Sequence, residues 1–86
     1  MPSVIKIEVL GPGCAKCNSL HAAVLDVINR MHMKAHISYI KEMDIIINRG
    51  VMMTPALIIT GKIVCQGRVP ENREITKWIS EAADAI

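Results

Sequence analysis

The sequence predicts an α/β fold with a central four-stranded mixed sheet and helices on both of its faces. Short apolar, β-branched segments alternate with segments whose apolar residues recur at helical spacing, and two later apolar segments flank a tight-turn pair. The predicted order is β-α-β-α-β-β-α, and two strand–helix units followed by a hairpin and a helix form such a sheet. With 86 residues, we expect one domain over 1–86.

The first two elements are a buried strand and a long helix. The strand is expected over 4–10, where Lys6 and Glu8 are the only polar residues in a β-branched apolar run. A Gly-Pro-Gly stretch then breaks it. An amphipathic helix is expected over 15–33, because apolar residues recur at helical spacing: Leu20, Val24, Val27, Ile28 and Met31.

The middle of the chain predicts a second strand over 35–40 and a short helix over 43–49. Gly50 follows that helix in the position that commonly ends helices. Two further strands are then expected over 56–59 and 62–66, joined around Thr60-Gly61.

The last segment predicts a helix that begins just after Pro70, since proline is well tolerated at helix starts. Its apolar residues follow the helical i, i+3, i+4, i+7 pattern: Ile75, Trp78, Ile79 and Ala82.

Composition argues against several classes of protein. The net charge is +2 and basic and acidic residues are interspersed, so the sequence predicts no basic patch that would bind nucleic acid or an anionic membrane. Tyr39 and Trp78 are the only aromatic residues, so there is no surface on which bases could stack. No apolar run approaches the roughly 20 residues that cross a bilayer, and we expect no signal peptide, because the N-terminal stretch lacks a basic region followed by a longer apolar one. We therefore expect a cytoplasmic protein, in which cysteines serve redox chemistry, metal binding or packing.

The stretch "GPGCAKC" places Cys14 at the start of the predicted helix and Cys17 on its apolar stripe. The first turn of a helix has unpaired N–H groups and a partial positive charge, which stabilise a thiolate. The pKa of Cys14 should therefore fall below that of a free thiol, and Lys16 adds a nearby positive charge. Cys14 is the more exposed of the two cysteines. The sequence therefore predicts that Cys14 attacks a substrate disulfide and that Cys17, one turn deeper, resolves the mixed disulfide.

Two other interpretations of the pair remain open. Both cysteines can simply be packing residues. Alternatively, Cys14, Cys17 and His21 along one helix face would suit a zinc or soft-metal site with one open position. There is no second cysteine pair, and the other histidines show no ligand spacing.

Nearly the whole chain resembles small archaeal and bacterial thioredoxin-like proteins, which are close in size to glutaredoxins. "GPGCAKC" resembles their active-site loop, "VMMTPALII" their Thr-Pro segment, and "TGKIVCQGRVP" the hairpin leading to the last helix. The resemblance implies a thioredoxin-like fold and a cis peptide bond between Thr54 and Pro55, facing the disulfide. Thr54, Pro55 and Gly13 would then bind an extended substrate. The other interpretation of Pro55 is that it only begins a strand.

The sequence also departs from the better-known branches of that family. Thioredoxins proper carry Trp before the first cysteine and Gly-Pro between the pair, where this chain has Gly13 and Ala15-Lys16. Glutaredoxins that use glutathione carry a Gly-Gly and an Asp after the hairpin. Here "CQGRVPEN" has one glycine and no such aspartate, which argues against glutathione as the partner.

Glu8 and Cys65 have two interpretations each. Thioredoxins bury an acidic residue six positions before the first cysteine, and Glu8 occupies that offset, where it would accept the proton of Cys17. The other interpretation, which we favour from sequence alone, is an exposed strand residue or one associated with Lys6. Cys65 lies inside an apolar run and is expected to be a small buried hydrophobe without a redox or ligand role.

The sequence therefore predicts a dithiol–disulfide oxidoreductase that uses a Cys14–Cys17 couple and no bound cofactor. The expected partners are disulfide-containing protein substrates and a separate thioredoxin-reductase-like electron donor, and the chain is expected to be a monomer. The alternative function is soft-metal binding or delivery by the same pair. Soft-metal chaperone domains, however, have a methionine before their cysteines and end in a strand, whereas this chain ends in a predicted helix and contains Thr54-Pro55.

Overall fold

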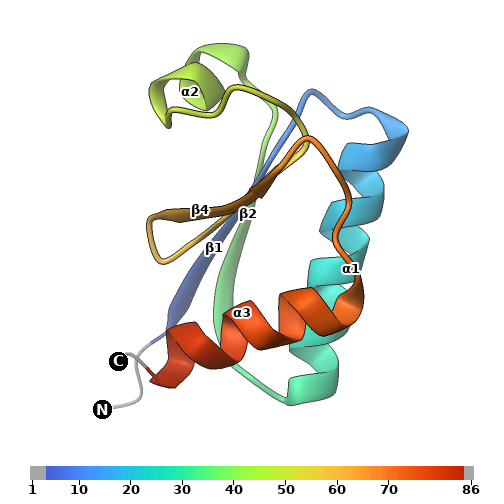
Figure 1. Ribbon diagram of the computed structural model, residues 1–86, viewed down its shortest axis with the longest axis vertical. Helices are drawn as coiled ribbons and strands as arrows, with labels where there is room; N and C mark the ends of the chain where they lie inside the picture. The colour runs from blue at the N-terminus through green and yellow to red at the C-terminus, as the bar shows by residue number, and fades with distance from the viewer. Residues whose placement is uncertain (1–3, 85–86) are drawn as a thin grey trace.

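The computed structural model describes residues 4–84 and has the predicted order of elements (Figure 1). The strands are β1 Ile5–Leu10, β2 Ala35–Ile40, β3 Ala56–Ile59 and β4 Lys62–Gln66. The helices are α1 Ala15–Met31, α2 Met43–Asn48 and α3 Asn72–Asp84. Each predicted strand and helix is present, with differences confined to the ends.

The sheet has the order β2-β1-β3-β4 and is mixed, as predicted. β1 pairs parallel with β2 and antiparallel with β3, and β3 pairs antiparallel with β4. Thr60 and Gly61 turn the β3–β4 hairpin with φ values of 49° and 83°. Two successive positive φ values are typical of the type I′ turn, whose twist matches that of paired strands.

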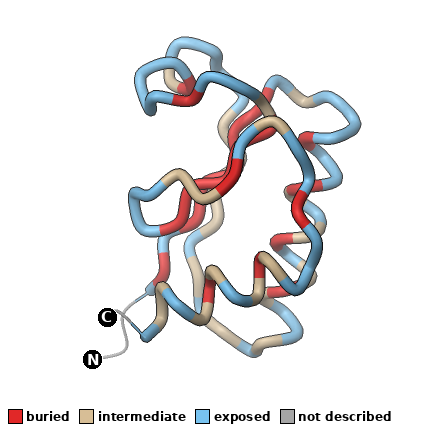
Figure 2. Tube along the Cα trace, in the orientation of Figure 1, coloured by how far each residue is buried: buried red, intermediate tan, exposed pale blue. Residues whose placement is uncertain are grey.

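The two faces of the sheet are covered unequally. One face packs on α1 and α3 through a core of buried residues: Ile5, Ile7, Val9, Leu20, Val24, Val27, Leu57, Ile59, Cys65, Ile75 and Ile79. The other face packs on α2 and the segment after it: Leu10, Ile46, Val51, Ala56 and Ile58. Figure 2 shows this burial concentrated along the strands and on the inner sides of the helices. Alternate residues of β1, namely Ile5, Ile7 and Val9, face the larger core, whereas Leu10 faces the smaller one, as the strand pleat requires.

α1 ends at Met31, two residues before the end that its apolar spacing predicts. His32 adopts a left-handed conformation with φ of 53°, and the N–H of Met33 bonds back to the Ile28 carbonyl. A left-handed residue directs the chain off the helix axis, so the apolar Met33 packs on the core from outside the helix.

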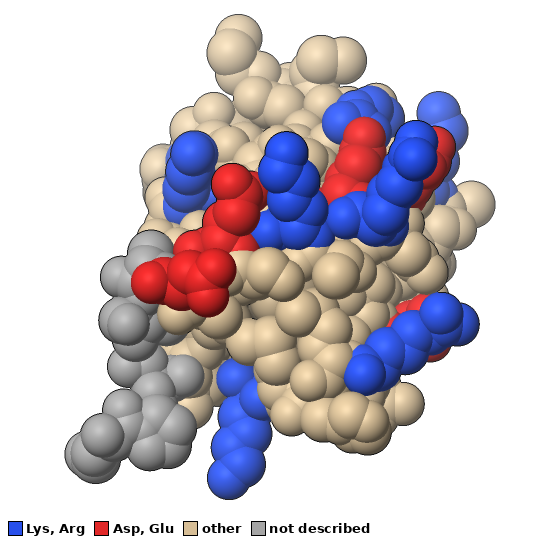
Figure 3. Space-filling view, turned by 60° about the horizontal axis from the view of Figure 1, so that its bottom comes forward, with Lys and Arg blue, Asp and Glu red and all other residues tan. Residues whose placement is uncertain are grey.

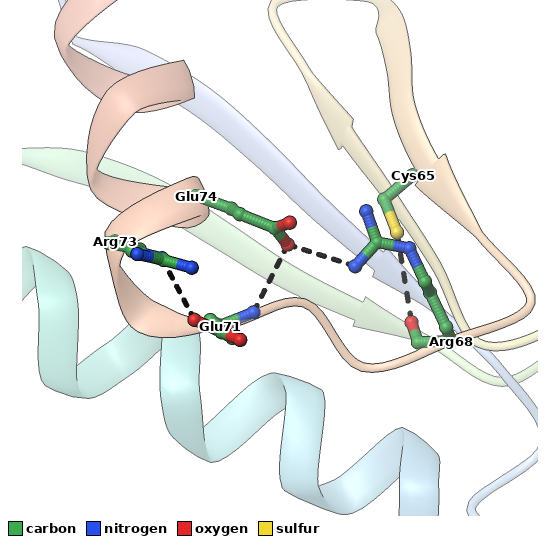
Figure 4. A network of polar contacts seen from close by, with 5 residues as sticks. All are labelled: Cys65, Arg68, Glu71, Arg73 and Glu74. Atoms are coloured by element: carbon green, nitrogen blue, oxygen red, sulfur yellow. Dashed lines mark hydrogen bonds and ion pairs between the residues drawn. The ribbon is translucent and has the colours of Figure 1, made fainter.

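A polar network fixes the start of α3 (Figure 4). The Glu74 carboxylate accepts the Glu71 N–H at 3.2 Å and pairs with Arg68 at 2.9 Å. The first contact satisfies an N–H just before the first helical turn, as in a capping box. The second ties the segment between β4 and α3 to the helix.

The surface carries charges of both signs. Figure 3 shows Lys and Arg side chains beside Asp and Glu side chains on one face of the molecule. Within residues 4–84, no helix combines the length and hydropathy needed to span a membrane.

Candidate active site

Cys14 and Cys17 lie at the start of α1 with their sulfur atoms 2.8 Å apart. Cys14 is the residue immediately before the helix and is exposed, whereas Cys17 is fully buried. The two thiols are free, and a disulfide bond of about 2.05 Å needs only a small approach of the sulfurs. The pair is thus one accessible sulfur with a second sulfur directly beneath it.

The environment drives the two thiol pKa values in opposite directions. The pKa of Cys14 is lowered first by a hydrogen bond from the Cys17 thiol, and then by the backbone N–H groups of Cys17 and Lys16. These N–H groups belong to the first turn of α1, where they have no partner within the helix. Burial raises the pKa of Cys17, and the hydrogen bond to Cys14 raises it further. Cys14 therefore ionises first, and Lys16 contributes through its backbone.

Gly11 brings the cysteine pair against the segment that enters β3. A Cβ atom at Gly11 would overlap the Cys17 sulfur and would lie 3.0 Å from the Cys17 Cβ. The same point lies 3.8 Å from the Pro55 Cα. Only glycine leaves room for this three-way contact between the end of β1, the buried thiol and Pro55.

The Thr54–Pro55 peptide bond is cis, and Pro55 is buried while Thr54 is half-buried. Three hydrogen bonds hold this segment. The Gly67 N–H donates to the Pro55 carbonyl at 2.8 Å, and the Gln66 side-chain oxygen accepts the N–H groups of Met52 and Met53. The end of β4 therefore fixes the backbone on both sides of Thr54.

The interpretation of Glu8 that the sequence favoured is wrong. Glu8 is only 6% exposed and is not associated with Lys6, because both of its carboxylate oxygens bind the Arg49 guanidinium, at 3.2 and 2.8 Å. Glu8 points to the α2 face of the sheet, where Arg49 directly follows α2.

His21 packs against an aromatic residue and is not part of a metal-binding group among the described residues. Its ring packs against the Tyr39 ring with centroids 4.7 Å apart. Among residues 4–84, no group of three or more His, Cys, Asp or Glu is arranged to hold a metal ion. Cys14, Cys17 and His21 are therefore not brought together in the arrangement that the metal-site interpretation of the pair requires.

Gly13 and Cys65 occupy different environments. Gly13 has φ of 101°, a conformation that side chains disfavour, and its carbonyl accepts a hydrogen bond from Asn18. Cys65 is buried in the larger core, where burial raises the pKa of its thiol. Its sulfur donates a weak hydrogen bond to the Arg68 carbonyl at 3.8 Å, in keeping with the packing role expected for it.

Five residues of this region were not expected from the sequence: Gly11, Asn18, Tyr39, Arg49 and Gln66. Asn18 lies one turn after Cys14 on α1, a spacing that could have marked it. Tyr39 and Arg49 reach the region only through the pairing of strands and the packing of α2, which no local motif reveals.

Comparisons with known proteins agree with this geometry. A family model described as a thioredoxin domain matches residues 5–80. A thioredoxin from Methanothermobacter thermautotrophicus is 34% identical over 77 residues, which are 90% of this chain and 100% of that protein. A thioredoxin from Methanocaldococcus jannaschii is 28% identical over 72 residues, which are 84% of this chain and 83% of that protein. With its four-stranded mixed sheet and a cysteine pair opening the first helix, the chain belongs to the thioredoxin family.

Proposed function

We propose that this protein reduces disulfide bonds of protein substrates by exchange with its Cys14–Cys17 dithiol. One observation carries the proposal: an exposed sulfur with a lowered pKa lies 2.8 Å from a buried sulfur with a raised pKa. The first is suited to attack from solvent and the second to displace what the first has captured. Membership of the thioredoxin family supports thiol–disulfide oxidoreductase activity.

The reaction has two exchange steps. The Cys14 thiolate attacks one sulfur of the substrate disulfide, the substrate S–S bond breaks, and the departing substrate thiolate takes a proton. Cys17 then attacks Cys14 in the mixed disulfide, a Cys14–Cys17 disulfide forms, and the proton of Cys17 ends on the second departing substrate sulfur. Two electrons pass from the dithiol to the substrate. A thioredoxin-reductase-like donor returns them to the protein.

The substrate chain lies beside the thiols, against Thr54, Pro55 and Gly13. Thr54 precedes β3 and therefore lies outside its ladder, and its backbone would pair with an extended segment of the substrate. The surroundings of Gly11 support this placement, because a Cβ atom there would overlap the Cys17 sulfur and would lie 3.8 Å from the Pro55 Cα, so the segment runs next to the dithiol.

The test is reduction of insulin disulfides with dithiothreitol as the electron donor. Cys14→Ser is expected to abolish activity, because the attacking sulfur is lost. Cys17→Ser is expected to accumulate a mixed disulfide between Cys14 and insulin, visible by mass spectrometry. Normal turnover by Cys17→Ser would contradict the assigned roles, and Cys65→Ser serves as the matched control that retains activity.

Soft-metal binding by the same pair is the competing function, and elemental analysis separates the two. The protein is purified under reducing conditions and its thiols are titrated. Stoichiometric metal that blocks thiol titration would favour the competing function, whereas two titratable native thiols that oxidise to one disulfide support redox exchange.

A further inference from the structure

Tyr39 and Asn18 form a hydrogen-bond chain that ends on the backbone just before Cys14. The Tyr39 hydroxyl donates to Asn18 Oδ1 at 2.7 Å, and Asn18 Nδ2 donates to the Gly13 carbonyl at 3.3 Å. Tyr39 belongs to β2 and Asn18 to α1. The chain therefore connects the sheet to the loop that carries the attacking thiol.

The phenol at the start of this chain is itself held by two neighbours. The His21 ring packs against it at 4.7 Å, and the Lys41 ammonium lies 4.8 Å from its centroid. Lys41 also lies along Gly13, since its Cδ is 3.9 Å from where a Gly13 Cβ would be. Tyr39 is thus a fixed donor rather than a freely rotating surface residue.

The acceptor at the other end of the chain belongs to the peptide that joins Gly13 and Cys14. The C=O and N–H of a trans peptide point in opposite directions, so anchoring the Gly13 C=O also fixes the Cys14 N–H. The Cys14 N–H contributes to lowering the pKa of both thiols, so a change in the orientation of this peptide would change how strongly the thiolate is stabilised. The positive φ of Gly13 is what lets the peptide take this orientation.

We infer that Tyr39 and Asn18 are positioning residues for the exchange reaction: they anchor the Gly13 carbonyl and thereby fix the orientation of the Gly13–Cys14 peptide, which carries the attacking thiol. The inference rests on the proposed function, because it concerns the same two sulfurs. A fixed amide dipole stabilises the thiolate without reorganising, whereas a rotating peptide would average that stabilisation away.

The phenol can serve as the donor throughout the range in which the thiols ionise. Burial raises the pKa of Tyr39, and negative charge on Cys17 and Cys14 raises it further. Tyr39 therefore stays protonated when Cys14 becomes a thiolate, which is when the anchored peptide is needed.

The test is the pH profile of Cys14 alkylation by iodoacetamide in the reduced full-length protein. Tyr39→Phe keeps the aromatic ring and removes only the hydroxyl. Its profile is expected to move to higher pH, so that alkylation at pH 7 slows roughly two- to fivefold, as the loss of one hydrogen bond predicts. At high pH, where the thiol is fully ionised, the rate should not fall.

A double-mutant cycle tests whether the two residues act as one chain. Asn18→Ala is expected to displace the profile in the same direction, and adding Tyr39→Phe to it should change nothing further. Thr76→Val is the matched control, because it removes one hydroxyl hydrogen bond, to the Asn72 carbonyl in α3, and should leave the profile in place.

Unchanged profiles in Tyr39→Phe and Asn18→Ala, or strictly additive displacements, would overturn the positioning role while leaving insulin reduction intact. Failure of the wild-type protein to reduce insulin would overturn the proposed function instead. The two failures are distinguishable because alkylation reports on the thiol alone and needs no disulfide substrate.

Discussion

Gly11 both extends the pairing of the sheet and makes room for the cysteine pair. Its backbone N–H continues the pairing of β1 with β2 by bonding to the Ile40 carbonyl at 2.9 Å. Its missing side chain makes room for the Cys17 thiol and for Pro55. A glycine at this position is therefore a requirement of packing against sulfur, and its φ is not in the left-handed region.

Gly11→Ala is expected to destabilise the reduced protein by about 1–3 kcal/mol, the usual cost of overpacking a well-packed site. The new methyl group would overlap the Cys17 sulfur, so Cys17→Ala in the same background should recover part of the loss. Urea denaturation of the single and double variants measures both effects. Equal losses with and without the Cys17 sulfur would show that the overlap is not the cause.

The ends of the helices show where local sequence signals stop being sufficient. The apolar periodicity predicted α1 because the buried face of this helix is regular. It placed the end of the helix two residues too late, because His32 adopts a left-handed conformation there. The tight turn at Thr60-Gly61 and the Gly50 helix stop were predictable because a single local conformation determines each. By contrast, the network at the start of α3 depends on Arg68, which lies before the helix and reaches Glu74 only in the folded chain.

Glu74 gives α3 a stability that depends on pH. The Arg68 guanidinium lowers the pKa of Glu74, so this contribution is complete above the unfolded-state pKa of about 4.3 and is lost as pH falls through the lower folded-state value. Glu74→Gln keeps a side-chain oxygen for the Glu71 N–H but removes the charge, and Glu74→Ala removes both. At pH 7 the urea midpoints should decrease in the order wild type, Glu74→Gln, Glu74→Ala. The gap between wild type and Glu74→Gln should close in acid, and a gap that persisted there would contradict the ion-pair contribution.

The Glu8–Arg49 pair joins two layers of the molecule. Glu8 is a buried residue of the central strand β1, and Arg49 follows α2, 41 positions later in the chain. The sequence pointed to Glu8 through its offset from Cys14 but favoured an exposed position, because only the packing of α2 against the sheet supplies its partner. The same holds for Tyr39 and Asn18, which are 21 positions apart. The cysteine pair and the Thr54-Pro55 segment were identifiable because each is contiguous in sequence.

Arg49→Met is expected to lower the urea midpoint clearly, because it leaves the Glu8 carboxylate buried without its counter-charge. Arg73→Met is the matched control: Arg73 pairs with Glu71 in an exposed contact, with side chains 84% and 67% exposed, and should change little. Adding Glu8→Gln to Arg49→Met should recover stability. If Arg49→Met were as stable as Arg73→Met, the pair would not be holding α2 on the sheet.

The burial of Cys65 has a consequence for how the folded chain responds to oxidants. Of its three cysteine sulfurs, that of Cys14 is exposed, that of Cys17 lies directly behind it, and that of Cys65 is enclosed in the larger core, where burial raises its pKa. Oxidation of the native protein can therefore close a single intramolecular ring, and mispaired isomers require the core to open first. The tertiary structure therefore restricts disulfide formation to Cys14 and Cys17 without an accessory isomerase.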